Sequence, residues 1–172
     1  MKKALIVTFD LSSHGEPATS IAAGSLLAFL RAKPEHGRDF TVEHLAIDMT
    51  GLSGEAAFQA AIDRLAPLSM DTFDTVAVSC FVWSDKSANR LLGYLRAGGF
   101  RGKLALGGGQ LAWNDPARLA ALYPACDIFI RGYGEASLLQ AILMERPVEP
   151  VVLSAPVVYE FLPSPYLTGA IP

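Results

Sequence analysis

The amino-acid sequence predicts an α/β protein that consists of a parallel sheet with helices on both faces. Short apolar runs of strand length alternate along the chain with longer segments in which apolar residues recur at helical spacing. The chain has 172 residues, of which 51% are hydrophobic and 18% charged, which suits one domain with its own core. We therefore expect a doubly wound, flavodoxin-like (Rossmann-like) sheet of five strands in the order 2-1-3-4-5.

The first strand is predicted over residues 4–9, where a continuous apolar run is typical of a strand buried on both faces. A polar turn follows, and Pro17 suits the first turn of a helix that extends to about Ala32, with Glu16 as a weak cap. Residues 40–47 alternate between apolar and polar side chains, which indicates a second strand nearer the edge of the sheet.

The remaining units follow the same alternation. Helical spacing predicts a helix over residues 54–65, and an apolar run predicts the third strand over residues 75–82. A helix over residues 86–97 should end at the glycines that follow it, because glycine is the usual residue after a helix. The other predicted elements are a strand over 103–106, a helix over 116–122 capped by Asp115, a strand over 127–130 and a helix over 135–144.

The composition changes after residue 146, because prolines crowd the rest of the chain. We expect residues 1–146 to form the α/β domain and residues 147–172 to form a proline-rich arm or linker. Residues 151–153 and 157–161 are candidates for short extended pieces within this arm. The prolines concerned are Pro147, Pro150, Pro156, Pro163, Pro165 and Pro172.

Charge and cysteine content exclude several classes of function. Fourteen basic and seventeen acidic residues give a net charge of −3, which argues against a nucleic-acid-binding protein. Cys80 and Cys126 form no C-x-x-C pair, so we expect two buried, reduced thiols rather than a zinc or iron–sulfur site. We also expect no membrane segment and a cytoplasmic location, since no apolar stretch approaches 20 residues and the N-terminal one is too short for a signal peptide.

Ligands of such sheets bind outside the carboxyl ends of the strands, which selects the segments 10–16, 79–84, 107–114 and 132–135. These segments are rich in glycine and serine and contain few groups suited to acid–base catalysis. They therefore suit a large ligand that lies against the backbone. Clustered aromatic residues favour a planar cofactor, although ordinary packing over the sheet ends explains them equally well. These aromatic residues are Trp83, Trp113 and Tyr133.

Each candidate also has a purely structural interpretation that the sequence leaves open. Gly107-Gly108-Gly109 allows close approach of a ligand to the backbone, or simply forms a tight turn. Ser79 is either a ligand contact or a core serine that bonds to nearby backbone. The segment 132–135 either passes beside a ring or only begins a helix. His14 is either a metal ligand or an exposed loop residue, and Asp10 either caps the loop or meets a polar ligand group.

Three segments of the sequence, taken together with their order along the chain, resemble the N-terminal cobalamin-binding domain of cobalamin-dependent radical SAM enzymes. That family has a similar Ser–aromatic–Trp pattern in its third strand, a Gly-Gly-Pro end to its fourth and a Gly-Glu-Gly-Glu end to its fifth. Here Gly109 replaces the proline and Tyr133 replaces the first glutamate. Residues 162–169 are also similar to the segment that leads into the radical SAM barrel. The three segments are 78–84 (VSCFVWS), 106–109 (LGGG) and 127–135 (DIFIRGYGE).

The resemblance implies a cobalamin whose nucleotide tail threads into the sheet beside Ser79 and the glycines. Residues 11–15 would approach the lower face of the corrin ring. His14 does not have the D-x-H-x-x-G spacing of the cobalamin carriers that bind cobalt through histidine, so base-off binding without a histidine ligand is expected and His14 remains a minor metal candidate. The expected cofactor contacts are Asp10, Leu11, Ser12, Ser13, His14, Ser79, Phe81, Trp83, Ser84, Gly107, Gly108, Gly109, Gln110, Gly132, Tyr133, Gly134 and Glu135.

The chain contains no C-x-x-x-C-x-x-C motif for an iron–sulfur cluster, so we expect no radical chemistry from it alone. The resemblance implies that a radical SAM barrel, in the same chain or in a partner, performs methyl transfer or a related radical reaction. A second hypothesis is a degenerate module that has lost cobalamin and serves in protein interaction. A flavin or nucleotide binder is a third, weakened because residues 11–15 contain a single glycine. A phosphoryl receiver is disfavoured because no aspartate ends the third strand.

Overall fold

The computed structural model describes residues 1–12, 20–112, 114–158, 160 and 162–171. Its strands form a single parallel sheet in the order β2-β1-β3-β4-β5-β6. The predicted order 2-1-3-4-5 is confirmed, and the prediction of five strands is wrong because a sixth strand joins the sheet beside β5. The strands are β1 (Lys2–Asp10), β2 (Phe40–Asp48), β3 (Thr75–Ser79), β4 (Lys103–Gly107), β5 (Ile128–Ile130) and β6 (Val151–Leu153).

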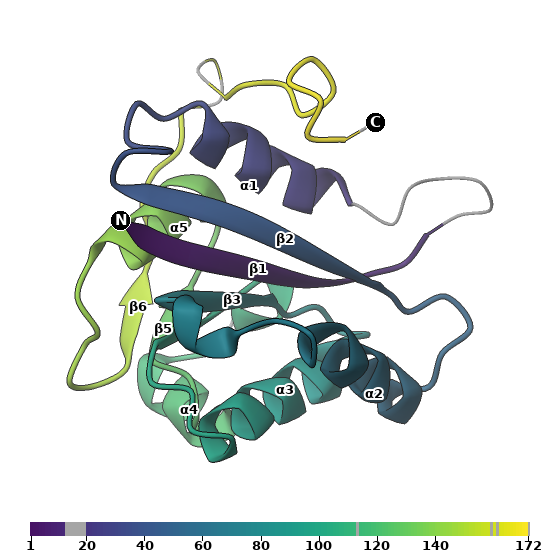
Figure 1. The fold of residues 1–172 in the computed structure, drawn as a ribbon. Coiled ribbons are helices and arrows are strands. Elements are labelled where there is room, and N and C mark those ends of the chain that lie inside the picture. The colour runs from purple at the N-terminus through teal and green to yellow at the C-terminus, as the bar shows by residue number, and fades with distance from the viewer. Residues whose placement is uncertain (13–19, 113, 159, 161, 172) are drawn as a thin grey trace.

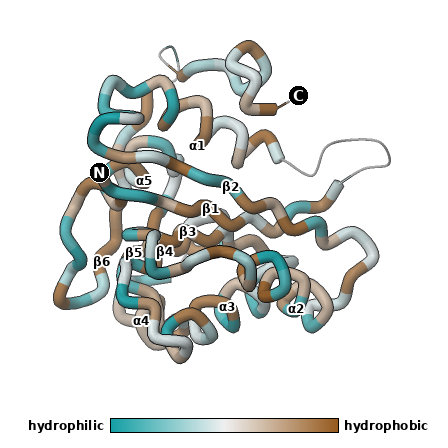
Figure 2. The backbone as a smooth tube through the Cα atoms, viewed as in Figure 1, coloured by the Kyte–Doolittle hydropathy of each residue, from teal (hydrophilic) through white to brown (hydrophobic). Residues whose placement is uncertain are grey.

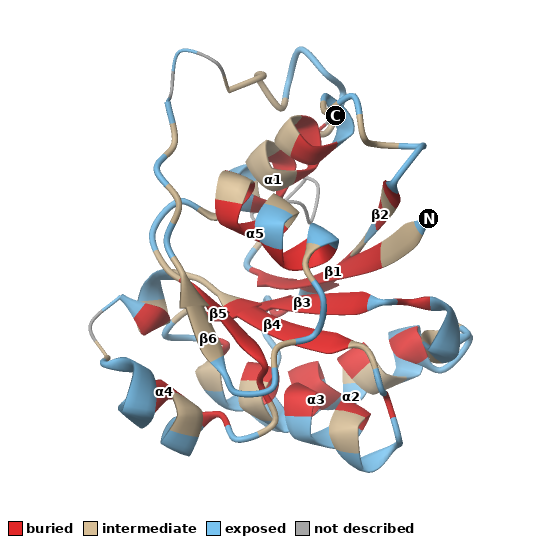
Figure 3. Cartoon of the chain, turned by 90° about the vertical axis from the view of Figure 1, so that its left-hand side faces the viewer, coloured by how far each residue is buried: buried red, intermediate tan, exposed pale blue. Residues whose placement is uncertain are grey.

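Helices cover both faces of this sheet, as the alternating sequence predicts (Figure 1). α1 and α5 lie on one face, while α2, α3 and α4 lie on the other. Two hydrophobic clusters result, one between the sheet and each helical layer, and the strands β3, β4 and β5 between them are mostly buried, whereas β6 is half-buried (Figure 3). The helices are α1 (Ile21–Arg31), α2 (Gly54–Leu65), α3 (Asp85–Ala97), α4 (Pro116–Leu122) and α5 (Gly134–Leu143), and the short 3-10 helices are η1 (Met70–Thr72) and η2 (Gly109–Leu111).

The burial of each strand explains its sequence pattern. β1 lies between β2 and β3, and its residues 4–10 are all buried, so the strand is almost continuously apolar. β2 forms one edge of the sheet, and its buried residues alternate with more exposed ones along most of its length. Hydropathy along the chain follows this difference (Figure 2).

Side-chain caps set several helix ends. The hydroxyl of Ser20 accepts a hydrogen bond from the Ala23 amide, so α1 begins at Ile21; Glu16 and Pro17, at the predicted start, lie outside the described residues. Asp115 caps α4 at the predicted position. The predicted extension of the third strand to Val82 is wrong. β3 ends at Ser79, because the Ser84 hydroxyl accepts from the Phe81 amide and turns the chain into α3.

The segment after residue 146 lies against the rest of the protein. The extended piece expected over residues 151–153 is confirmed, because Val151–Leu153 forms β6 and pairs in parallel with Ile128–Ile130 of β5. Of the piece expected over residues 157–161, positions 159 and 161 lie outside the described residues, and the described positions form no strand. Further along, Ile171 is buried against Gly24 of α1, where an added Cβ would lie 2.4 Å from the isoleucine side chain. The boundary at residue 146 remains a prediction, but the arm contributes to both the sheet and the α1 surface.

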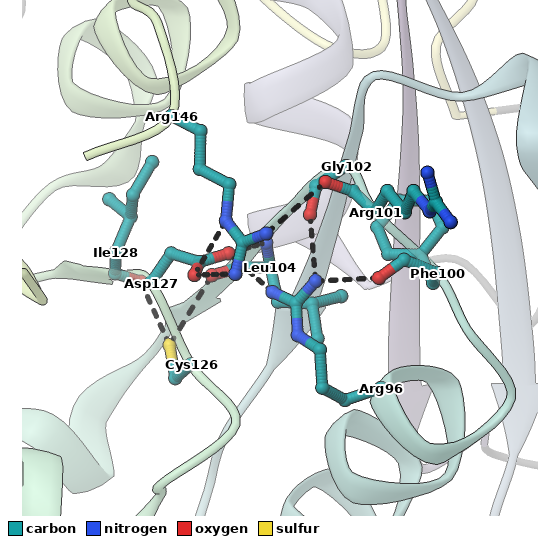
Figure 4. Close-up of polar contacts among 9 residues, drawn as sticks. All are labelled: Arg96, Phe100, Arg101, Gly102, Leu104, Cys126, Asp127, Ile128 and Arg146. Carbon is teal, nitrogen blue, oxygen red and sulfur yellow. Dashed lines mark hydrogen bonds and ion pairs between the residues drawn. The ribbon is translucent and has the colours of Figure 1, made fainter. Parts of the chain in front are cut away.

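A charged cluster fixes the start of β5 (Figure 4). Asp127 has only 9% of its surface exposed, and its Oδ2 accepts hydrogen bonds from Arg96 at 2.6 Å and from the Leu104 amide at 2.7 Å. Its Oδ1 accepts from Arg146 at 2.9 Å. The carboxylate therefore links α3, β4 and the chain that leaves α5. The neighbouring thiol of Cys126 donates to the Ile128 carbonyl, and burial raises its pKa, as expected for an inert cysteine.

Both cysteines are buried and free of disulfides, as the sequence predicts. Burial raises the pKa of Cys80 to about 12, so its thiol stays protonated near neutral pH. Within the described part of the chain, no helix combines the length and apolar character needed to cross a membrane.

Candidate functional site

A cavity of about 600 Å³ opens at the carboxyl ends of the strands, on the face that α1 and α5 cover. Ile6, Ala77 and Ile130 come from three strands of this face, and Leu138 of α5 lies opposite them. The strand order reverses between β1 and β3, so the cavity lies at the switch point where α/β sheets bind ligands. Its walls are mostly apolar, as in most small-molecule sites.

The cavity brings together residues from three of the four segments that the sequence selects. They come from the ends of β3, β4 and β5 and from the turns that follow these strands. The predicted residues that line the cavity are Ser79, Phe81, Gly107, Gly108, Gly109, Gly132, Tyr133, Gly134 and Glu135.

The other predicted residues are placed elsewhere or are not described. Ser13 and His14 lie outside the described residues, as does Trp113, so the possible cobalt ligand stays a prediction. The described residues that do not line the cavity are Asp10, Leu11, Ser12, Trp83, Ser84 and Gln110.

Glycine is required at two points of the cavity wall. Gly108 has φ +136°, and a Cβ at this position would lie 2.2 Å from the Cys80 carbonyl oxygen. Gly132 has φ +74° at the turn into α5. Gly109 differs, because it lines the cavity but a Cβ there would meet no atom within 4 Å.

Ser79 sits at the end of β3 and lines the cavity while it bonds to neighbouring backbone. Its Oγ accepts a hydrogen bond from the Phe9 amide at 3.0 Å. This bond supports the structural interpretation of a satisfied core serine. It uses the oxygen as acceptor, so the hydroxyl hydrogen can still be donated toward a ligand.

Glu135, in the first turn of α5, is the only Asp, Glu, Lys, Arg or His among the described cavity-lining residues. It is 6% exposed, and its Oε1 accepts a hydrogen bond from the Ser25 hydroxyl of α1 at 2.7 Å. Its Oε2 is buried and has no hydrogen-bond partner within the described residues. The helix N-terminus favours the carboxylate charge electrostatically but does not supply the missing bond.

Asp10 belongs to a buried polar chain that begins beside the cavity. The Thr8 hydroxyl lines the cavity and donates to Asp10 Oδ2 at 2.6 Å. Since the single hydroxyl proton is used there, the contact of 2.8 Å between Thr8 Oγ1 and His44 Nε2 requires the imidazole to donate. Burial lowers the pKa of His44, which favours this neutral form. Asp10 is thus satisfied inside the protein.

Ser12 binds the loop after β2 rather than the cavity. Its hydroxyl donates to Asp48 at 2.5 Å, and its amide donates to the Thr50 hydroxyl at 3.0 Å. Hydrogen bonds from Ser12 and Thr50 lower the pKa of Asp48 to about 2. The loop end of β1 is thereby attached to the loop that follows β2.

Apolar and aromatic side chains form a rim at this end of the sheet. Phe81 and Trp83 stack with ring centroids 4.9 Å apart, and the Trp83 indole donates to the Phe9 carbonyl. Leu11, which follows β1, and Tyr133, which precedes α5, are also exposed. We call these residues, with Val82, the apolar rim: Leu11, Phe81, Val82, Trp83 and Tyr133.

Sequence reasoning missed the contribution of α1 and β1 to the cavity. Ser20 and Ser25 line it from the helix, and Thr8 lines it from the strand. The cap at Ser20 carries a recognisable sequence signal, a serine three residues before an apolar helix face. Nothing in the local sequence marks Ser25, because its role depends on Glu135, 110 residues away.

A protein-bound metal centre finds no support in the described residues. They contain no group of three or more His, Cys, Asp or Glu side chains that could hold a metal ion. No histidine occurs among the described residues that line the cavity.

Comparisons with known proteins do not assign the chain to a family. No protein-family model matches it, and no curated protein matches it.

Proposed function

We propose that this protein is a cobalamin-binding module that holds the cofactor base-off, with the nucleotide tail in the cavity between the sheet and the α1–α5 layer. The observation that carries the proposal is the cavity itself. It lies at the switch point of the sheet, and Ser79, Gly107–Gly109 and the 132–135 turn all line it. These are the segments on which the resemblance to cobalamin-binding domains depends.

The residues present fit such a ligand in three respects. The volume of about 600 Å³ suits a nucleotide-sized group. The apolar walls suit a flat heterocycle, and Gly109 leaves space where a larger side chain would intrude. Ser79 and Glu135 supply polar contacts, whereas no described residue of the lining supplies an imidazole. The donor set therefore favours binding through the tail rather than through a protein ligand to cobalt.

When bound, cobalamin would supply a cobalt centre for methyl transfer or radical rearrangement. The residues of this chain would bind and orient it. The apolar rim would lie beside the corrin ring, and a radical SAM barrel, in the same chain or in a partner, would cover that face. The exposure of Val82 (77%), Tyr133 (57%) and Trp83 (46%) favours such a cover, because these large apolar side chains all follow carboxyl ends of strands.

The test is a titration of the purified protein with hydroxocobalamin, followed by absorbance and calorimetry. We expect about one corrin per chain and a base-off spectrum. Gly109→Phe should weaken binding strongly, because Gly109 lines the cavity and a ring can be added there without a clash at its Cβ. The matched control is Gly93→Phe, which changes an exposed glycine of α3 that likewise has open space around it.

Failure of the wild-type protein to bind at about 100 μM, an affinity weaker than about −5.5 kcal/mol, contradicts the proposal for the isolated chain. Repeating the titration with a radical SAM barrel added in trans then separates an incomplete site from the degenerate interaction module. Equal corrinoid binding by Gly109→Phe and Gly93→Phe would show that the corrinoid binds outside this cavity.

A further inference from the structure

Glu135 has a hydrogen-bonding requirement that the described protein leaves unmet. One carboxylate oxygen is satisfied by Ser25, while Oε2 is buried and unpartnered. A buried polar atom without a partner costs stability, so its presence calls for an explanation. Because Glu135 lines the cavity, a ligand placed there is a direct source of the missing donor.

The residues around Glu135 indicate which class of ligand would carry this hydrogen-bond donor. Ser25 of α1 lines the cavity at the carboxylate, whereas Ile6, Ala77 and Leu138 line it with apolar surface. The cavity therefore combines a polar corner of one hydroxyl and one carboxylate with apolar walls. In dinucleotide-binding α/β domains a carboxylate accepts hydrogen bonds from a ribose hydroxyl, which shows that this acceptor chemistry suits a sugar. A base attached to a sugar matches both parts of this lining.

We infer that Glu135 is the specificity-determining residue of the cavity and binds a ribose hydroxyl of a nucleoside-like ligand. The inference rests on the proposed function for the source of this ribose, because the nucleotide tail of cobalamin contains a ribose beside its base. The ribose hydroxyl donates a hydrogen bond to the carboxylate, and no covalent step is involved. Ser25 acts as a positioning residue, since it holds the other carboxylate oxygen and ties α1 to α5.

The test uses two small probes that differ in the sugar, 5,6-dimethylbenzimidazole and its riboside, titrated into the full chain and followed by NMR chemical shifts. We expect the wild-type protein to bind the riboside at least about tenfold more tightly than the free base, as a hydrogen bond to a charged group provides. Glu135→Gln should lose most of this preference, because the hydrogen bond to the ribose hydroxyl is no longer strengthened by the carboxylate charge. Glu149→Gln, an exposed glutamate beyond α5, is the matched control and should keep it.

A stability measurement separates this role from a structural one. Glu135→Gln should unfold, without ligand, at a temperature no lower than Glu149→Gln, because it removes a buried charge whose bonding is incomplete. An unchanged riboside preference in Glu135→Gln overturns the inference, and clear destabilisation beside it assigns Glu135 a structural role. Should Glu135→Gln not fold, Glu135→Asp keeps the charge, withdraws it from the cavity and must likewise lose the preference.

The outcome is distinguishable from that of the proposed function. Titrating the same samples with hydroxocobalamin tests corrinoid binding separately. Riboside preference without corrinoid binding would contradict cobalamin as the ligand and leave the role of Glu135 standing. Corrinoid binding by a wild-type protein that shows no riboside preference would overturn the role of Glu135 and leave the module standing.

Discussion

The backbone of Gly108 lies against the backbone of Cys80, so closely that a Cβ on the glycine would be 2.2 Å from the Cys80 carbonyl oxygen. The contact joins the end of β4 to the turn that follows β3, and the Gln110 amide and the Cys80 carbonyl lie 3.4 Å apart in the same region. These two turns form one wall of the cavity. The glycine run therefore serves the fold at one position and the cavity at another.

Gly108→Ala should destabilise the protein, while Gly109→Ala should be tolerated. The first substitution combines a clash with backbone atoms and a φ of +136°, a cost of about 2 kcal/mol or more. The second adds a methyl group in open space and should change the stability by less than about 1 kcal/mol. Urea unfolding of both variants measures the difference. Equal stabilities would show that the two turns separate easily.

Asp127→Asn should lower the free energy of unfolding by about 3 kcal/mol, because it leaves Arg96 and Arg146 without their buried counter-charge. The amide oxygen can still accept from the Leu104 amide, so the loss reports the charge more than the backbone bond. Asp39→Asn is the control, since its ion pair with Arg38 is exposed and should matter little. Denaturant unfolding compares the variants, and similar small losses in both would argue against a structural role for the Asp127 cluster.

Lys103 should make stability rise in alkaline solution. Its ammonium group donates to the Ile142 and Met144 carbonyls at the end of α5, and burial lowers its pKa from 10.5 to about 8. Between about pH 8 and 10.5 the folded protein has therefore released a proton that the unfolded chain still binds. The free energy of unfolding rises with pH across this window, by up to about 3 kcal/mol.

This contribution is isolated by subtracting the pH profile of Lys103→Met from that of the wild-type protein. The subtraction also removes the opposing effect of the buried thiols, whose raised pKa values weaken the fold in alkali. Lys86→Met, at an exposed position of α3, should give a flat difference profile. A flat difference profile for Lys103→Met would show that the pKa of Lys103 is the same in the folded and unfolded protein.

Local patterns predicted the strand order because each βα unit carries its own signal. The apolar run of β1 and the alternation of β2 follow from burial on two faces and on an edge. For β6 the sequence predicted only a short extended piece over residues 151–153, since its place in the sheet depends on pairing with β5. The end of β3 was missed for a related reason, because the apolar residues after Ser79 belong to an aromatic turn that Ser84 closes.

The cavity shows the same division. Glycines and Ser79 could be selected because a rule of topology points to the ends of parallel strands. Whether each polar side chain faces the cavity or bonds within the protein depends on partners that are distant in sequence. Ser12 binds the loop after β2, and Glu135 pairs with Ser25 of α1. Such pairings have no local pattern, so the sequence indicated where the cavity lies better than which side chains would be free to serve it.

The C-terminal arm should detach when its anchor is shortened. Ile171 is 5% exposed against Gly24 of α1, and Leu162 of the same arm lines the cavity. Ile171→Ala removes apolar contacts worth about 2 kcal/mol or more and should raise amide hydrogen exchange along residues 162–171. The sheet strands should keep their protection, because α1 still packs on them through Leu27 and Leu30. Leu167→Ala, at a position 91% exposed, is the control and should leave the exchange of the arm unchanged. Similar exchange in both variants would show that Ile171 does not hold the arm, and faster exchange throughout the sheet would show that the arm is part of the cooperative core.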